Sequence, residues 1–193
     1  MEEYKLSVAS SPHASSPVGT KNLMRDVLIA LIPAMAMGIY VFGPRALTTT
    51  LVSVIFCEIF EWGYCKLMHK PNPVGDLSAC VTGVILALNM PVSMPLWIAI
   101  VGALVAIVII KQLFGGLGYN FANPALVGRI VLFLGFTSRM TAYVYPDMSV
   151  DALASATPLN AAVDLHSVSF VDMLLGIHGG MMGETCVIAI LLG

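Results

Sequence analysis

The chain has 193 residues, of which 58% are hydrophobic and only 10% are charged, and its net charge is −2. Soluble domains carry about 25% charged residues, so this composition excludes a water-soluble domain and indicates an integral membrane protein. The mean hydropathy is +0.90, and the absence of a basic patch in the sequence argues against a nucleic-acid partner.

The amino-terminal part predicts a polar arm and two long membrane helices. Residues 1–21 are rich in Ser and Pro, which predicts an extended arm rather than a cleaved signal peptide. The apolar segments 22–42 and 46–68 are each long enough to cross a bilayer, which takes about 20 residues. The second carries Glu58 and Glu61 on one helical face. These carboxylates are expected to line an ion path, to be hydrogen-bonded packing residues, or, for Glu61, to lie near the headgroups.

Three further apolar segments are predicted, and two of them are short. Segments 77–90 and 124–136 are bounded by prolines and have too few residues to cross comfortably, whereas 95–114 between them is long enough. Short, interrupted segments predict discontinuous helices, whose free ends line binding sites in membrane proteins. Asp76 is expected to cap the first of these short helices.

The connection at residues 115–123 is rich in Gly and Asn. Irregular backbone at membrane depth survives where it is packed in protein or lines a cavity. Asn120 is therefore expected either to face a ligand or to serve as a turn residue, and Asn123, before Pro124, is more simply a helix cap. The last regions are a polar connection at 137–182 and, at 183–193, the start of a sixth apolar segment that we expect to continue in a second half. The four scattered cysteines form no Cys-x-x-Cys pair and predict neither a disulfide nor a metal site within the chain.

The polar connection contains Asp-Ala-Leu-Ala-Ser-Ala-Thr, ending at Thr157. This stretch resembles the flavin-transfer motif Asp-x-x-(Ser/Thr)-(Gly/Ala)-Ala-Thr, in which the final threonine is esterified to the phosphate of FMN. Asp151, Ala156 and Thr157 match the motif, while Ala154 and Ser155 depart from it but remain small. The alternative is an ordinary turn, since Ser, Thr and Pro are common there.

A second stretch, residues 115–129, is similar to the other signature of the same family. Together the two motifs resemble the RnfD component of the Rnf electron-transport complex and, as an alternative, the NqrB component of the sodium-translocating NADH:quinone oxidoreductase; the short arm favours Rnf. The resemblance implies an all-α polytopic helical bundle, one half of an inverted-repeat fold like that of urea channels. It also implies covalent FMN on Thr157 and a non-covalent riboflavin near Asn120, Asn123 and Arg129. Arg129 is expected to pair with a flavin or a carboxylate, or to satisfy backbone carbonyls.

The implied function is electron transfer between ferredoxin and NAD+ coupled to Na+ or H+ transport. The implied partners are iron–sulfur subunits and a second covalent-FMN subunit, in the cytoplasmic membrane of a bacterium or archaeon. A channel or transporter without redox chemistry and a structural anchor for redox subunits are the alternatives. The positive-inside rule places the amino terminus and Lys111 on the cytoplasmic side and the Thr157 loop outside.

Overall fold

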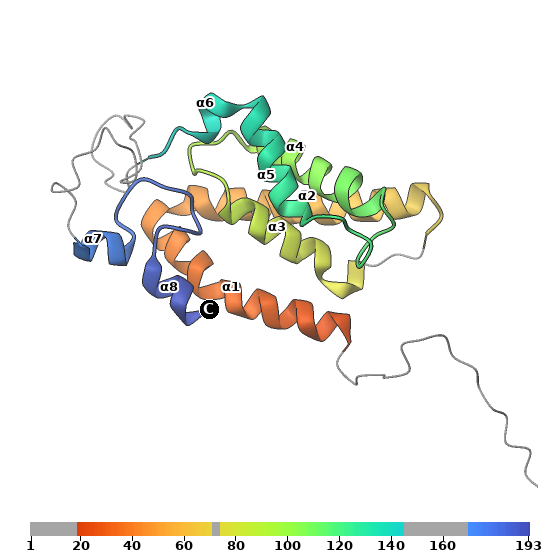
Figure 1. Cartoon of the computed structure of the whole chain (residues 1–193), viewed down its shortest axis with the longest axis horizontal. Coiled ribbons are helices and arrows are strands. Elements are labelled where there is room, and N and C mark those ends of the chain that lie inside the picture. Colours follow the sequence, from red (N-terminus) through yellow and green to blue (C-terminus); the bar gives the residue numbers. More distant parts are fainter. Residues whose placement is uncertain (1–18, 71–73, 145–169) are drawn as a thin grey trace, which may run out of the picture.

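The computed structural model describes residues 19–70, 74–144 and 170–193. Every regular element in these ranges is a helix, as expected for an all-α membrane protein (Figure 1). Two helices, α1 (Thr20–Phe42) and α2 (Pro44–Leu67), are long and apolar enough to cross a membrane. Only Gly43 separates them, and its φ of 76° is a backbone conformation that glycine adopts without strain.

Short apolar helices pack against α2. They are α3 (Ser78–Leu88), α4 (Leu96–Leu104) and α5 (Pro124–Gly135), and the 3₁₀ turn η1 (Val74–Asp76) precedes α3. Helix α4 continues directly into a π-helix, η2 (Val105–Gln112), so the expected segment 95–114 is a single rod of two helical types. Helices α3 and α5 have 11 and 12 residues, which makes each too short to cross a bilayer alone.

Helix α3 approaches α2 closely because Gly83 lies at their contact. A Cβ atom built on Gly83 would stand 2.7 Å from Cα of Val54. At the same contact, the hydroxyl of Ser53 donates to the carbonyl oxygen of Gly83 over 2.8 Å. A small residue and a hydroxyl at a helix crossing are typical of membrane proteins, where backbones approach without a hydrophobic driving force.

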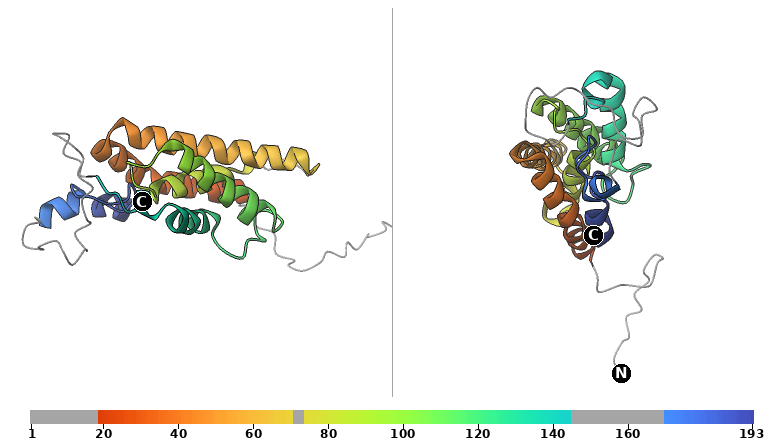
Figure 2. Two further views of the ribbon diagram at one scale, coloured as in Figure 1. Left: turned by 90° about the horizontal axis from the view of Figure 1, so that it is seen from above. Right: turned by 90° about the vertical axis from the view of Figure 1, so that its left-hand side faces the viewer.

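The last described segment returns to the bundle beside α1 and α3 (Figure 2). The backbone amide of Gly183 donates to the carbonyl oxygen of Leu88 over 2.9 Å. A Cβ atom on Gly38 of α1 would stand 2.7 Å from the carbonyl oxygen of Met182. This segment includes the short helices α7 (Phe170–Leu175) and α8 (Val187–Leu192); α6 (Thr137–Met140) follows α5.

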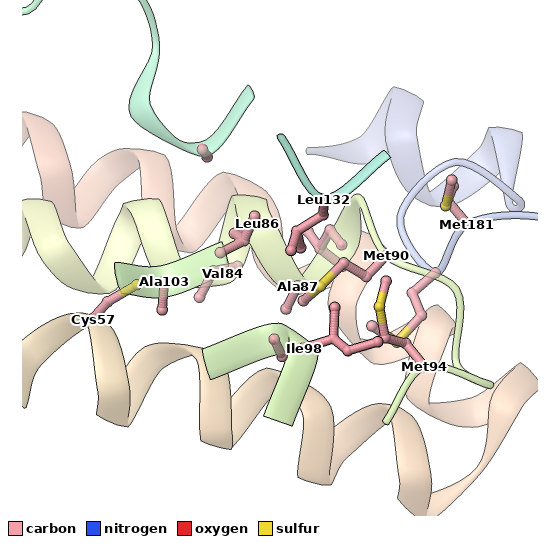
Figure 3. Close-up of a cluster of buried hydrophobic side chains, with 14 of the residues drawn as sticks. Cys57, Val84, Leu86, Ala87, Met90, Met94, Ile98, Ala103, Leu132 and Met181 are labelled. Carbon is pink, nitrogen blue, oxygen red and sulfur yellow. The ribbon is translucent and has the colours of Figure 1, made fainter. Parts of the chain in front are cut away.

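The apolar core lies between α2, α3, α4 and α5 (Figure 3). At its centre, Leu86 of α3 and Leu132 of α5 are fully buried, and Ile98 of α4 is 1% exposed. Methionines gather where α3 ends and the last segment returns; Met90, Met94 and Met181 are all at most 2% exposed. Their flexible side chains fill the irregular space left around the turn between α3 and α4.

Candidate functional site

A buried ion pair joins α2 to the π-helix. Oε1 of Glu61 lies 2.5 Å from Nζ of Lys111, and the two side chains are 0% and 2% exposed. Gln112 donates from Nε2 to the same carboxylate oxygen over 2.7 Å. Removing one partner from such a pair costs about 3–5 kcal/mol, because the other charge is left buried and uncompensated. Glu61 and Lys111 therefore hold each other in place.

The π-helix explains how Lys111 and Gln112 both reach one carboxylate. In an α-helix, consecutive residues are turned by about 100°, so Ile110, Lys111 and Gln112 would spread over more than half of the circumference. In η2 all three are buried, with at most 7% exposed. Wider π turns are rare and occur frequently at functional sites. Here the π turn places an ammonium and an amide side by side within the bundle.

A hydroxyl extends this pair to a second carboxylate. Lys111 donates to Oγ of Ser78 over 2.5 Å, and that hydroxyl donates to Oδ1 of Asp76, also over 2.5 Å. Asp76 also accepts from the backbone amide of Ser78 over 2.8 Å. Asp76 thus supports the start of α3 as expected, and it is also the end of a hydrogen-bonded chain that begins at Glu61.

This chain borders a cavity of about 370 Å³. Its lining includes Glu61, Asp76 and Lys111 together with Gly115 and Gly116 of the connection after η2. Both glycines have positive φ, 119° and 96°, so the backbone turns tightly at this wall. We call the five side chains around this cavity the polar cluster; they are Glu61, Asp76, Ser78, Lys111 and Gln112.

The structure brings only one of the two predicted acids of α2 into the polar cluster. Glu61 is buried and hydrogen-bonded, so it faces neither lipid nor water. Oε2 of Glu61 and Oε2 of Glu58 are both buried without a hydrogen-bond partner among the described residues. Glu58 is half-buried. Both features fit an ion path and a packing role alike.

Sequence reasoning missed the role of Lys111. The positive-inside rule assigns it to the cytoplasmic surface, but it is 1% exposed and lies inside the bundle. The signal that could have found it is a lysine in an apolar segment that neighbours a segment carrying acids, because buried charges require partners. Ser78 and Gln112 gave no comparable signal.

The residues expected near riboflavin lie apart from one another in their contacts. Asn123 caps α5, since its Oδ1 accepts from the amide of Ala125 over 3.0 Å. Oδ1 of Asn120 is buried without a hydrogen-bond partner among the described residues. Nη1 of Arg129 donates to Oδ1 of Asn89 over 2.9 Å, so its partner is a neutral amide at the end of α3. The flavin-motif residues Asp151, Ser155 and Thr157 lie outside the described residues.

Comparison with known proteins agrees with both motifs. The model of the NQR2, RnfD, RnfE family matches residues 7–193. The RnfD-type component of a Na+-translocating ferredoxin:NAD+ oxidoreductase complex from Acetobacterium woodii is 42% identical over 198 residues, covering 100% of this chain and 62% of the relative. The corresponding component of a proton-translocating ferredoxin:NAD+ oxidoreductase complex from Clostridium ljungdahlii is 33% identical, covering 96% of this chain and 60% of the relative.

A third relative is the corresponding component of an ion-translocating oxidoreductase complex from Halorhodospira halophila. It is 38% identical over 141 residues, covering 72% of this chain and 40% of the relative. The chain thus spans less than two thirds of the length of these curated relatives. With a family model that matches nearly all of its residues, the chain belongs to the NQR2, RnfD, RnfE family.

Proposed function

We propose that the chain is the electron-transferring RnfD-type membrane component of an ion-translocating ferredoxin:NAD+ oxidoreductase complex. The observation that carries this proposal is 42% identity, over the whole chain, to the relative from Acetobacterium woodii. Its partners would be the other subunits of that complex, including iron–sulfur subunits and a second subunit with covalent FMN. Its location would be the cytoplasmic membrane of a bacterium or archaeon.

We infer that FMN is bound covalently to Thr157 through a phosphoester. The match of Asp151, Ala156 and Thr157 to the flavin-transfer motif supports this inference. When bound, the flavin ring accepts and passes electrons, while the protein sets its position and its environment. The small side chain of Ser155 would leave the threonine hydroxyl accessible to the transferring enzyme.

A second, non-covalent flavin is proposed near the connection after η2. The buried Oδ1 of Asn120 fits this role, because it can accept a hydrogen bond from a ligand such as riboflavin. Asn123 is engaged as a helix cap and Arg129 is engaged by Asn89. These two residues would therefore position α5 beside the flavin rather than rely on it as their hydrogen-bond partner.

Glu58 and Glu61 are proposed as part of the ion path. Each has a carboxylate oxygen that is buried without a hydrogen-bond partner among the described residues. An intramembrane carboxylate is costly unless it is paired or used, which makes such an oxygen a candidate to receive a cation or a proton. The relatives translocate Na+ in one case and protons in another, so both ions must be tested.

The flavin assignment is tested by Thr157→Ala in the intact native complex. We expect flavin fluorescence at the position of this protein on a denaturing gel to disappear, because a phosphoester alone survives denaturation. Ser155→Ala is the matched control and should retain the fluorescence. If the Thr157→Ala protein fluoresces as strongly as the unsubstituted one, the flavin is attached elsewhere. If the unsubstituted protein carries no flavin, the redox role fails.

The side of the membrane is tested with a cysteine at position 155. We expect an impermeant thiol reagent to label Ser155→Cys from outside cells, because the charges at the ends of the apolar segments favour a cytoplasmic amino terminus. Labelling from the cytoplasm alone would overturn this topology.

Two other functions compete with electron transfer. Short helices and buried acids also suit a channel or transporter, which predicts an unmodified Thr157 in protein purified from its native host. A structural anchor for redox subunits predicts that Thr157→Ala leaves electron transfer through the complex intact.

A further inference from the structure

The ammonium of Lys111 has two acidic groups within reach. It contacts Glu61 directly at 2.5 Å, and it reaches Asp76 through the hydroxyl of Ser78. Lysine carries its charge on a flexible four-carbon stem, so rotation about side-chain bonds alone can shift the ammonium from one acid towards the other. The cavity of about 370 Å³ beside these groups gives the side chain space for that shift.

The second oxygen of Glu61 remains open. Oε2 is buried without a hydrogen-bond partner among the described residues, and Glu61 lines the cavity. The side chain of Glu61 is 0% exposed, so water outside the bundle does not satisfy this oxygen. A cation entering the cavity would find this oxygen, but the ammonium already on the same carboxylate would repel it. In this structure Lys111 therefore stands where an incoming cation would be neutralised.

We propose that Lys111 is a tethered cation that occupies Glu61 in place of the translocated ion. The ion binds Glu61 when the ammonium moves towards Asp76, and the return of the ammonium to Glu61 releases the ion. This inference rests on the proposed ion-translocating function. Lys111 is a positioning residue in this scheme, because it acts on the ion through Glu61.

The scheme requires two arrangements with similar stability, and the polar cluster provides partners for both. Gln112 holds Oε1 of Glu61 in either arrangement, and Ser78 remains hydrogen-bonded to Asp76. An ion that binds only when the ammonium is on the Asp76 side shifts the population to that side. The titratable groups in and around the cluster are Cys57, Glu58, Glu61, Cys65, Lys70, Asp76 and Cys80.

The first test uses the unsubstituted complex and amine acetylation. Acetic anhydride is applied at constant ionic strength in choline chloride, with or without Na+, and at two pH values. Peptide mass spectrometry then gives the labelling of Lys111 relative to Lys66, whose ammonium lies 4.7 Å from the Trp62 ring centroid and outside the polar cluster. We expect saturating ion to raise this ratio at least about threefold, because the ammonium moves away from Glu61.

The two arms of this test separate the ions. A rise with Na+ identifies an alkali-ion site, and a rise with acid alone identifies a proton site. A ratio that changes with neither Na+ nor pH overturns the proposal.

The second test measures the ion dependence of turnover in two variants. In Lys111→Met the competitor for Glu61 is gone, so the half-saturating ion concentration should fall at least about tenfold, with slower turnover at saturation because release is impaired. Lys111→Arg keeps the charge and should stay within about twofold of the unsubstituted complex. An assembled Lys111→Met complex with unchanged half-saturation contradicts the proposal; if this variant does not assemble, the acetylation result decides.

Failure of this inference and failure of the proposed function are distinguishable. Flavin on Thr157 and electron transfer through the complex do not depend on the position of the Lys111 ammonium. A flavin-bearing, active complex with an ion-independent acetylation ratio would reject the tethered cation alone.

Discussion

At the start of α3 a lysine is buried against a carboxylate, and at the end of the same helix an arginine is held by a neutral amide. Lys111 pairs with Glu61 beside a cavity, and Ser78 links it to a second acid. Arg129 donates to Asn89, whose own amide nitrogen donates to the carbonyl oxygen of Ile85 over 2.8 Å.

This difference separates a place where charge can change from one where it cannot. A carboxylate can bind a proton or a metal ion, and lysine can move or lose its charge when buried. Arginine stays protonated, and an asparagine side chain does not titrate. We therefore interpret the polar cluster as the end of α3 that takes part in ion transfer and the Arg129 contact as the end that fixes the helix.

The largest expected effect comes from removing the ammonium. Lys111→Met should lower the free energy of unfolding by about 3–5 kcal/mol, because Glu61 is left buried without its partner. The double variant Lys111→Met/Glu61→Gln should recover most of this loss. Thermal or denaturant unfolding of the purified complex measures both. A double variant as unstable as the single one would show that packing, and not charge, dominates this contact.

The same variant sharpens the comparison through its dependence on the ion. Binding of an ion to the freed Glu61 stabilises the folded state by about 2.7 kcal/mol at one hundred times the dissociation constant. The loss in Lys111→Met should therefore shrink as the concentration of the coupling ion rises.

At the opposite end of α3, Arg129→Gln should cost about 1.5–3 kcal/mol, the range for a hydrogen bond to a charged group. This loss should be the same at every concentration of the coupling ion, because neither Arg129 nor Asn89 binds it in our account. Unfolding measurements in Na+ and in choline give the answer. An ion-dependent loss would mean that both ends of α3 respond to the ion and would break the comparison.

The middle of α3 tests whether the two ends are joined by a rigid contact. Gly83→Ala should destabilise the protein by about 1–3 kcal/mol, because the added methyl meets backbone atoms of Val54. Gly63→Ala in α2 is the matched control, since a Cβ atom there meets nothing within 4 Å, and it should be neutral or stabilising by up to about 1 kcal/mol. Equal effects of the two substitutions would argue against a tight α2–α3 contact.

The smallest effect concerns the start of α5, the helix that carries Arg129. Asn123→Ala should cost about 1 kcal/mol, because the amide of Ala125 loses its cap. Asn123→Ser should restore most of the stability, since serine is also a good cap. If both variants are equally unstable, Asn123 has a further partner besides Ala125.

Much of the helical layout could be predicted because apolar segment length and proline position carry it. The two long segments correspond to α1 and α2, and Pro124 begins the short α5. The π-helix could not be predicted, because the segment 95–114 has no residue that breaks an α-helix near its end. The burial of Lys111 depends on that π turn, so the polar cluster could not be assembled from the sequence.

Single side chains were predicted better than their partners. Glu61, Asn123 and Arg129 drew attention as polar groups at membrane depth or before a proline, and each has a defined contact in the structure. Their partners depend on which helices meet. Asn89, Ser78 and Gln112 are ordinary in the sequence and become informative only through the packing of α3 against α2, η2 and α5.

The most direct test of the whole account is the mass of the peptide that contains Thr157, from protein purified with its complex from the native host. The account predicts an added mass of FMN less one water, with fragmentation placing it on the threonine. An unmodified peptide at full recovery would contradict the electron-carrying role.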